Sequence, residues 1–155
     1  MNILVLCTGN SARSILLESL LNGLGQGRIR AFSAGSHPTG RVHPKALALL
    51  EREGLPYADV RSKSWDEFAV PDAPQMQAVI TVCGSAAAET CPIWPGAPAR
   101  GHWGVEDPVA ATNQDKAFAE AFNILKDRAQ AFLALAPETM NPDDLRQAIT
   151  QSGSL

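Results

Sequence analysis

The sequence predicts an α/β protein in which a four-stranded parallel sheet lies between two layers of helices. Short runs of branched apolar residues, such as 2–7 and 77–82, alternate along the chain with longer stretches of helical periodicity. Glycine and proline residues separate most of these runs, as is typical of loops. This alternation indicates a three-layer fold with helices on both faces of the sheet, and such folds bind ligands at the carboxyl ends of their strands.

The first half of the chain predicts two strands and two helices. Strand 2–7 is followed by a helix over 14–24, which two glycines close. Residues 28–35 alternate charged and apolar side chains, as expected of a second strand with one face near solvent. Pro44 marks the start of a second helix, whose apolar residues repeat at helical spacing until Gly54 ends it.

The second half of the chain predicts two more strands and a long helix. Ser64, with Glu67 three residues later, indicates a capped helical turn. Strands are expected over 77–82 and 101–105. An amphipathic helix is expected over 115–135, because its large apolar residues share one side.

The 155 residues suit one catalytic domain, 1–136, followed by a C-terminal extension, 137–155. The formal net charge is −3, which does not favour a nucleic-acid partner. No stretch reaches the roughly 20 apolar residues of a membrane span, and the chain enters its first strand without a signal sequence. We therefore expect a cytoplasmic monomer that binds neither nucleic acid nor membrane.

The chain has three cysteines, Cys7, Cys83 and Cys91. An odd number in a reducing compartment argues against a structural disulfide framework and leaves catalytic or redox roles open. His37 and His43 lack ligand spacing with the cysteines, so we interpret them as loop residues and not as metal ligands.

The stretch after the first strand predicts an anion site. A Cys-x5-Arg-Ser pattern begins at Cys7, and its tight polar turn leads into the N-terminus of a helix. Backbone N–H groups that converge there favour an oxyanion, as does the helix dipole. The expected oxyanion-binding residues are Thr8, Gly9, Asn10, Ser11, Ala12, Arg13 and Ser14.

Cys7 is expected to be the nucleophile that attacks the bound oxyanion. The helix N-terminus and the Arg13 guanidinium favour its thiolate and lower the pKa of the thiol. The planar fork of Arg13 matches two oxygens of a tetrahedral anion, and the Ser14 hydroxyl can donate a hydrogen bond to the sulfur. The alternative is a buried structural cysteine in front of an ordinary helix cap.

An attack of this kind needs a proton donor for the departing oxygen. Asp107 is the candidate, because the proline that follows it fixes a turn at the edge of the sheet. Glu106 ranks second, since adjacent side chains point in different directions. Cys83 and Asp107 follow strands, as Cys7 does, and the carboxyl ends of parallel strands meet at one edge.

Further short motifs accompany this loop. They are 7–14 (CTGNSARS), 32–35 (FSAG), 43–46 (HPKA), 91–93 (CPI), 102–104 (HWG) and 106–108 (EDP). Together with Cys83, these segments resemble the low-molecular-weight protein tyrosine phosphatase fold and, within it, the thioredoxin-coupled arsenate reductases. The resemblance covers residues 1 to about 135.

The resemblance implies an arsenate reductase that uses three cysteines in turn and serves arsenic detoxification. Cys7 would attack arsenate, for which phosphate and sulfate are analogues, and Asp107 would protonate the leaving oxygen. Cys83 would then attack the Cys7 sulfur as arsenite leaves, and Cys91 would take over the disulfide, which thioredoxin reduces. The sequence departs from the family twice. Ala12 stands where many relatives have a further cysteine, and the interval between the last two cysteines is one residue longer than usual.

Some relatives bind a potassium ion near the loop, although the resemblance implies no required cofactor. The matching positions carry oxygen-bearing side chains, which suit a hard cation. They are Asn10, Glu18, Ser33 and Asp66. The alternative is that these residues tie the loop by hydrogen bonds without a metal.

Two other functions stay open as alternatives. A low-molecular-weight protein tyrosine phosphatase would use Cys7, Arg13 and Asp107 in the same way and release phosphate through water. Such phosphatases usually present aromatic residues after Asp-Pro, whereas residues 109–111 are valine and two alanines, which favours the reductase. The other is a non-catalytic protein that binds oxyanions or senses redox state. The reductant is open between thioredoxin and glutaredoxin with a low-molecular-weight thiol.

Overall fold

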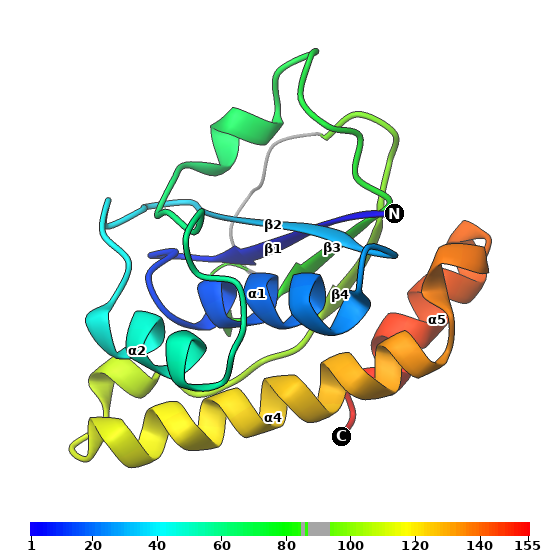
Figure 1. Ribbon diagram of the computed structural model, residues 1–155. Helices are drawn as coiled ribbons and strands as arrows, with labels where there is room; N and C mark the ends of the chain where they lie inside the picture. Colours follow the sequence, from blue (N-terminus) through cyan, green and yellow to red (C-terminus); the bar gives the residue numbers. More distant parts are fainter. Residues whose placement is uncertain (85, 87–93) are drawn as a thin grey trace.

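The structure, a computed structural model, describes residues 1–84, 86 and 94–155. Four parallel strands form one sheet in the order β2-β1-β3-β4 (Figure 1). They are β1 Asn2–Cys7, β2 Arg30–Gly35, β3 Ala78–Thr81 and β4 Ala99–His102. The register pairs Cys7 with Gly35, and it pairs Thr81 with both Leu6 and His102. The carboxyl ends of all four strands therefore lie at one edge.

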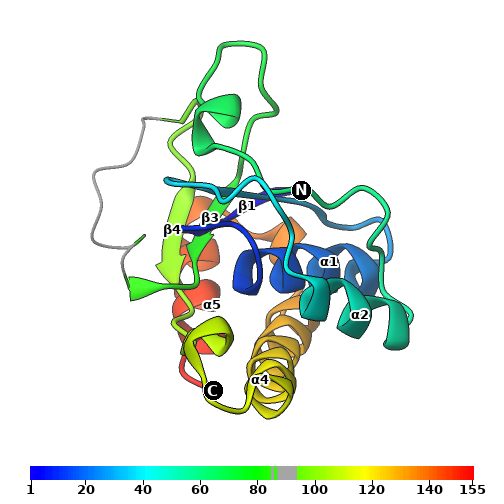
Figure 2. The same ribbon diagram turned by 90° about the vertical axis from the view of Figure 1, so that its left-hand side faces the viewer.

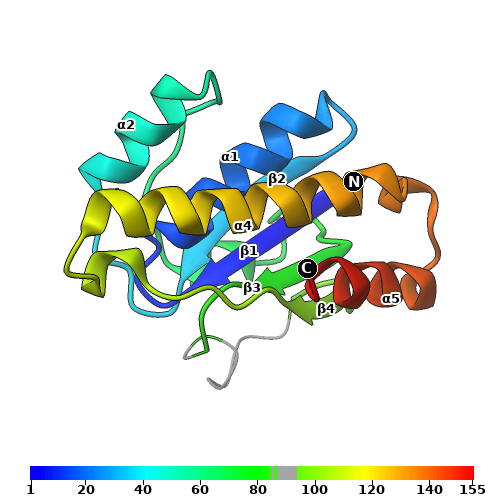
Figure 3. The same cartoon turned by 90° about the horizontal axis from the view of Figure 1, so that it is seen from below.

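Most helices of the described residues gather on one face of the sheet. They are α1 Arg13–Gly25, α2 Pro44–Arg52, α4 Gln114–Ala134 and α5 Pro142–Ser152. Helices α1 and α4 lie along this face, α5 packs beneath β3 and β4, and α2 flanks α1 and α4 (Figures 2 and 3). Within the described part of the chain, no helix is both long and apolar enough to cross a lipid bilayer.

The two faces of β1 contribute to two hydrophobic cores, because side chains alternate along a strand. Ile3 and Val5 are fully buried in the core that α1, α4 and α5 share. Leu4 faces the other way and packs in a smaller core with Phe68 and Trp94. Among the described residues, this second face is covered by a short 3-10 helix, η1 Trp65–Phe68, and its neighbouring loops. The predicted α/β fold with a four-stranded parallel sheet is confirmed.

The expected elements are confirmed to within two residues at their ends, with one correction. The fourth strand, expected over 101–105, begins earlier and spans Ala99–His102. The Ala99 N–H donates to the Gln77 carbonyl at 3.0 Å, which extends the ladder with β3 towards the N-terminus. Prolines before this segment hid its start, because proline is depleted in strands.

The predicted turn after Ser64 forms, but the predicted capping box does not close. The Ser64 Oγ caps η1 by accepting the Asp66 N–H at 3.2 Å. The Glu67 carboxylate instead pairs with Arg61, whose Nη2 lies 2.5 Å from Oε1. The turn is therefore capped by the serine alone.

Residues 137–155 form η3 Pro137–Thr139 and α5, and both pack onto the rest of the chain. Leu145 and Ile149 of α5 are buried in the same core as α1 and α4. The indole N–H of Trp103 donates to the Ile149 carbonyl at 2.8 Å. The segment that we expected to be an extension thus covers the sheet beneath β4 and supports the segment that leads to Asp107.

Candidate active site

The expected site residues meet at the carboxyl end of β1. Cys7 is the last residue of β1, the loop 8–12 follows it, and α1 begins at Arg13. A cavity of about 370 Å³ lies here, and the loop lines it together with Cys83 and Asp107. Parts of the chain that are far apart in the sequence therefore form one pocket.

The loop presents backbone N–H groups to this pocket. The carbonyl oxygens of Thr8, Gly9 and Ser11 accept hydrogen bonds of 2.9, 3.0 and 2.8 Å from N–H groups of the surrounding loops. Because a trans peptide points its carbonyl and its N–H in opposite directions, the N–H groups of the same peptides face the pocket. The N-cap residue of α1 is Ala12, which has no capping side chain, so the first turn of the helix is open to an anion as well.

Asn10 fixes the shape of the loop. It is fully buried and adopts a left-handed conformation with a φ of 47°, which asparagine tolerates better than most residues. Its Nδ2 donates to Ser14 Oγ at 2.8 Å and to Ser33 Oγ at 3.0 Å, and its Oδ1 accepts the Lys63 N–H at 2.9 Å. Gly35 makes room for the loop, since a Cβ there would collide with a loop carbonyl.

Arg13 and Asp107 lie beside each other in the wall of the pocket. The Nη1 of Arg13 donates to the Val105 carbonyl at 2.8 Å, and its Nη2 lies 3.9 Å from the Oδ2 of Asp107. The Asp107 side chain is 46% exposed, so solvent reaches its carboxylate. Only 14% of the Arg13 side chain is exposed, which suits a fixed cation that holds an anion. Glu106 is exposed and does not line the cavity.

Cys7 and Cys83 line the same pocket, and the interaction between their sulfurs shifts the two pKa values in opposite directions. The hydrogen bond with Cys83 and burial raise the pKa of Cys7, although Arg13 acts in the opposite direction. The same hydrogen bond lowers the pKa of Cys83 to about 5, against the effect of burial. The Thr8 N–H donates to the Cys83 sulfur at 3.3 Å, and the Thr8 hydroxyl lies 3.4 Å from it.

The prediction of a lowered pKa at Cys7 is therefore wrong for the resting pair. Arg13 does favour the Cys7 thiolate, as expected, but the Cys83 sulfur is closer to more hydrogen-bond donors. The lowered pKa of Cys83 favours a negative charge on its sulfur, in a site built for anions.

We expect this charge to appear in a thiolate titration. The ultraviolet absorbance of a thiolate should be present at neutral pH and disappear as the pH falls through about 5. The Cys83→Ser variant should lose this transition, and Cys91→Ser should keep it. The ordinary pKa of a cysteine thiol is 9.0, so between pH 5 and 9 the Cys83 thiol binds a proton in the unfolded chain but not in the folded one. The contribution of Cys83 to the free energy of unfolding therefore rises with pH across that window. An unchanged transition in Cys83→Ser would contradict the assignment.

Three of the four expected potassium ligands lie in or beside a buried cluster beneath the loop. Asn10, Glu18 and Ser33 are buried there together with Lys63, whose Nζ lies 3.8 Å from the Glu18 Oε1. Burial raises the pKa of Glu18 and lowers that of Lys63, while their mutual attraction opposes both shifts. Asp66 lies on η1 with its side chain exposed. Because an ammonium already faces the buried carboxylate, this set of residues does not fit an additional potassium ion.

Several residues of the site were not found from the sequence. Thr39 and Val109 line the pocket, and the Thr39 N–H donates to the Gly9 carbonyl at 3.0 Å. The Ser62 hydroxyl donates to the same carbonyl at 3.2 Å. The loop after the second strand was a signal for Thr39, because it follows a strand end. Ser62 and Lys63 come from an irregular segment with no such signal.

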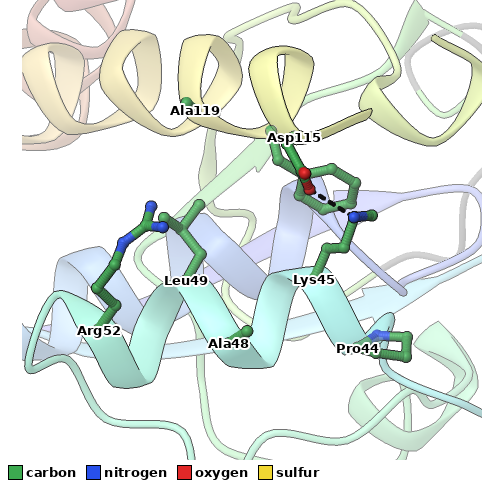
Figure 4. A pocket seen from close by; sticks show the side chains of 8 residues that line it. Pro44, Lys45, Ala48, Leu49, Arg52, Asp115 and Ala119 are labelled. Carbon is green, nitrogen blue, oxygen red and sulfur yellow. Dashed lines mark hydrogen bonds and ion pairs between the residues drawn. The ribbon is translucent and has the colours of Figure 1, made fainter. Parts of the chain in front are cut away.

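A larger cavity, of about 500 Å³, lies between α2 and α4 (Figure 4). Leu49 and Phe118 form part of its wall, and the Lys45 Nζ lies 2.5 Å from the Asp115 Oδ1. The described lining includes no cysteine, and the charges of Lys45 and Asp115 neutralise each other. The smaller cavity at Cys7 is therefore the better candidate for chemistry on an oxyanion.

The third expected cysteine, Cys91, lies outside the described residues. On one side of this interval, Ala86 is buried and its N–H donates to the Cys83 sulfur at 3.4 Å. On the other side, Trp94 is buried in the smaller core. The part that Cys91 plays in a relay stays a prediction.

Comparisons with known proteins agree with this site. Residues 2–144 match the family of low molecular weight phosphotyrosine protein phosphatases. An arsenate reductase of Halalkalibacterium halodurans is 32% identical over 125 residues, which are 81% of this chain and 86% of that protein. A glutaredoxin arsenate reductase of Synechocystis sp. is 31% identical over 106 residues, or 68% of this chain and 77% of that protein.

A solved structure of an arsenate reductase is also similar to this chain. It is described as an arsenate reductase in the phosphate binding state, and it superposes with a TM-score of 0.67 at 26% sequence identity. The match covers 86% of this chain and 97% of that chain. A parallel sheet with a Cys-x5-Arg anion loop after its first strand defines this class of protein, and the chain belongs to the low molecular weight phosphotyrosine protein phosphatase family.

Proposed function

We propose that this protein is an arsenate reductase that passes a disulfide along its cysteines. One observation carries this conclusion: Cys83 lines the oxyanion pocket together with Cys7, and its sulfur accepts the N–H of Thr8, the residue next to Cys7. A hydrolase needs one nucleophile there, whereas a reductase needs a second thiol to displace the first sulfur from arsenic. The arsenate reductase of H. halodurans, at 32% identity, supports the same reaction.

In the first step, arsenate binds to the loop N–H groups and to the part of the Arg13 guanidinium that does not bind Val105. The Cys7 sulfur attacks arsenic, and its proton passes to the Cys83 thiolate. An arsenic–oxygen bond breaks, and protonated Asp107 donates a proton to the departing hydroxide, which leaves as water. A sulfur–arsenic adduct on Cys7 results.

In the second step, Cys83 attacks the Cys7 sulfur. The Cys83 thiol gives its proton to the Asp107 carboxylate, a disulfide forms, and the sulfur–arsenic bond breaks. The electron pair of that bond stays on arsenic, which is reduced from As(V) to As(III) and leaves as arsenite. Two thiols have then supplied two electrons, and one oxygen atom has left as water.

In the third step, Cys91 attacks the Cys83 sulfur, which frees Cys7 and leaves a Cys83–Cys91 disulfide. This step is needed because Cys7 and Cys83 are only 5% and 4% exposed, which keeps a protein reductant away from a disulfide between them. Thioredoxin is the expected reductant of the new disulfide. Glutaredoxin is the second candidate, which the similarity to the Synechocystis protein supports. The role of the reaction is arsenic detoxification.

A phosphatase is the second candidate function, because the whole family shares the anion loop. Cys7, Arg13 and Asp107 would transfer a phosphoryl group as readily as they bind arsenate. Val109, which lines the pocket beside Asp107, is small and aliphatic and cannot stack on a tyrosyl ring. Residues 110 and 111 are alanines, so they add no aromatic wall. Hydrolysis of small aryl phosphates is therefore expected only as a side reaction.

A coupled assay tests the proposal. NADPH oxidation is measured with thioredoxin and its reductase, with arsenate, with phosphate, and without oxyanion. We expect oxidation with arsenate alone, because only arsenic accepts the electron pair. Omission of thioredoxin is the control, and glutaredoxin replaces it in a parallel run. Brisk hydrolysis of an aryl phosphate without arsenate-dependent oxidation by either reductant would make the protein a phosphatase.

A further inference from the structure

We propose that the Lys63 ammonium occupies the cation position beneath the anion loop, so that the protein has a built-in cation there and binds no potassium. The cluster consists of Lys63, Glu18, Asn10 and Ser33, and all four side chains are buried. The inference goes beyond the reduction of arsenate and does not depend on it. It concerns what holds the loop in its anion-binding shape.

Lys63 is held in the cluster by both its ammonium group and its backbone. Its Nζ donates to the Arg61 carbonyl at 2.9 Å and lies 3.8 Å from the Glu18 Oε1. Its N–H donates to the Asn10 Oδ1 at 2.9 Å, and its carbonyl accepts the Gly35 N–H at 2.9 Å. Lysine is rarely buried this far without a charged partner, so the ammonium and the Glu18 carboxylate form one unit.

The charges around the cluster balance without an added ion. Glu18 faces Lys63, and the next charges, Arg61 and Glu67, form a pair of their own. A potassium ion would add an unbalanced positive charge beside a buried ammonium, and Coulomb repulsion is strong where water is excluded. Asp66, whose carboxylate would be needed to balance that charge, is exposed on η1.

Asn10 connects the cluster to the anion loop. Its side chain bridges the Lys63 backbone to Ser14 at the start of α1 and to Ser33 of β2. Its left-handed conformation, with a φ of 47°, reverses the direction of the backbone so that the loop N–H groups face the pocket. Loss of the Lys63 ammonium would leave Glu18 buried and unpaired next to this bridge. A cation that entered the vacated space would restore the pairing.

The melting temperature of the full chain tests this proposal in potassium, sodium and choline chloride at equal ionic strength. The unaltered protein should melt within about 1 °C in all three salts, because equal ionic strength screens surface charges equally. Lys63→Ala should melt lower in choline chloride, and potassium chloride should raise its melting temperature by at least about 2 °C, because an ion that binds only the folded state stabilises it.

Two variants serve as controls. Lys45→Ala removes an exposed ion pair with Asp115, so it should change stability little and show no preference for potassium. The double variant Glu18→Gln/Lys63→Met removes both buried charges, so it should fold without a preferred cation. The unaltered protein and this double variant decide the question even where Lys63→Ala does not fold.

A melting temperature of the unaltered protein that rises with potassium but not with choline would overturn the proposal, because the site would then hold an ion besides Lys63. A folded Lys63→Ala protein that melts alike in potassium and choline would overturn it too. The proposed reduction of arsenate survives either result, since the readout is stability and not turnover.

Discussion

Replacement of Cys7 by serine should abolish both reduction of arsenate and hydrolysis of aryl phosphates, by more than about a thousandfold. Cys7 lies at the end of β1 beneath the open N–H groups of the loop, where its sulfur can reach the central atom of a bound oxyanion. A serine hydroxyl at the same place has a far higher pKa than a thiol, so it supplies almost no nucleophile near neutral pH. Initial rates with both substrates measure the effect.

The loss should be one of chemistry and not of fold. Phosphate should still bind to Cys7→Ser by calorimetry, because Arg13 and the loop N–H groups are unchanged. Cys83→Ser is the matched control: it should keep the hydrolysis of aryl phosphates within about tenfold, because Cys83 forms a bond only in the second step and the bound oxyanion can take the Cys7 proton in its place. Retained reduction of arsenate in Cys7→Ser would remove Cys7 from the mechanism.

Replacement of Cys91 by serine should stop thioredoxin-linked turnover while the first two steps continue. The variant should release one arsenite per chain and then stall with a disulfide between Cys7 and Cys83. Both sulfurs are buried, so thioredoxin cannot reach this bond, whereas a small dithiol can. Rates with thioredoxin should therefore fall by about a hundredfold or more, since only slow opening of the buried pair remains.

The hydrolysis of aryl phosphates gives an internal check on Cys91→Ser. Before arsenate is added, this activity should equal that of the unaltered protein. After one turnover with arsenate it should vanish, because Cys7 is locked in the disulfide, and a small dithiol should restore it. Equal loss of hydrolysis and reduction before any arsenate is added would mean that Cys91 supports the fold.

Much of the fold could be predicted because its elements carry strong local signals. The apolar run of β1, the glycines after α1 and the proline that starts α2 each have one physical interpretation. Parallel strands then bring their carboxyl ends together, which placed Cys7, Cys83 and Asp107 in one pocket without further information. The start of β4 was missed because its ladder is set by pairing with β3 and not by its own composition.

The distribution of charge in the site could not be predicted from the sequence. Arg13 and the helix N-terminus favour a thiolate at Cys7, and only the structure places Cys83 and Thr8 close enough to lower the pKa of Cys83. The position of Lys63 is a similar case. Nothing in its local sequence marks it as buried, because its burial depends on Glu18, which lies 45 positions earlier on α1.

The central claim is that two sulfurs of the pocket reduce arsenate and a third takes over the disulfide. The most direct measurement is a single turnover: fully reduced protein is mixed with arsenate in the absence of any reductant, then trapped by a thiol reagent, and its peptides are mapped by mass spectrometry. We expect one arsenite per chain, a disulfide between Cys83 and Cys91, and a free Cys7. Arsenite release without a disulfide, or no arsenite at all, would contradict the account.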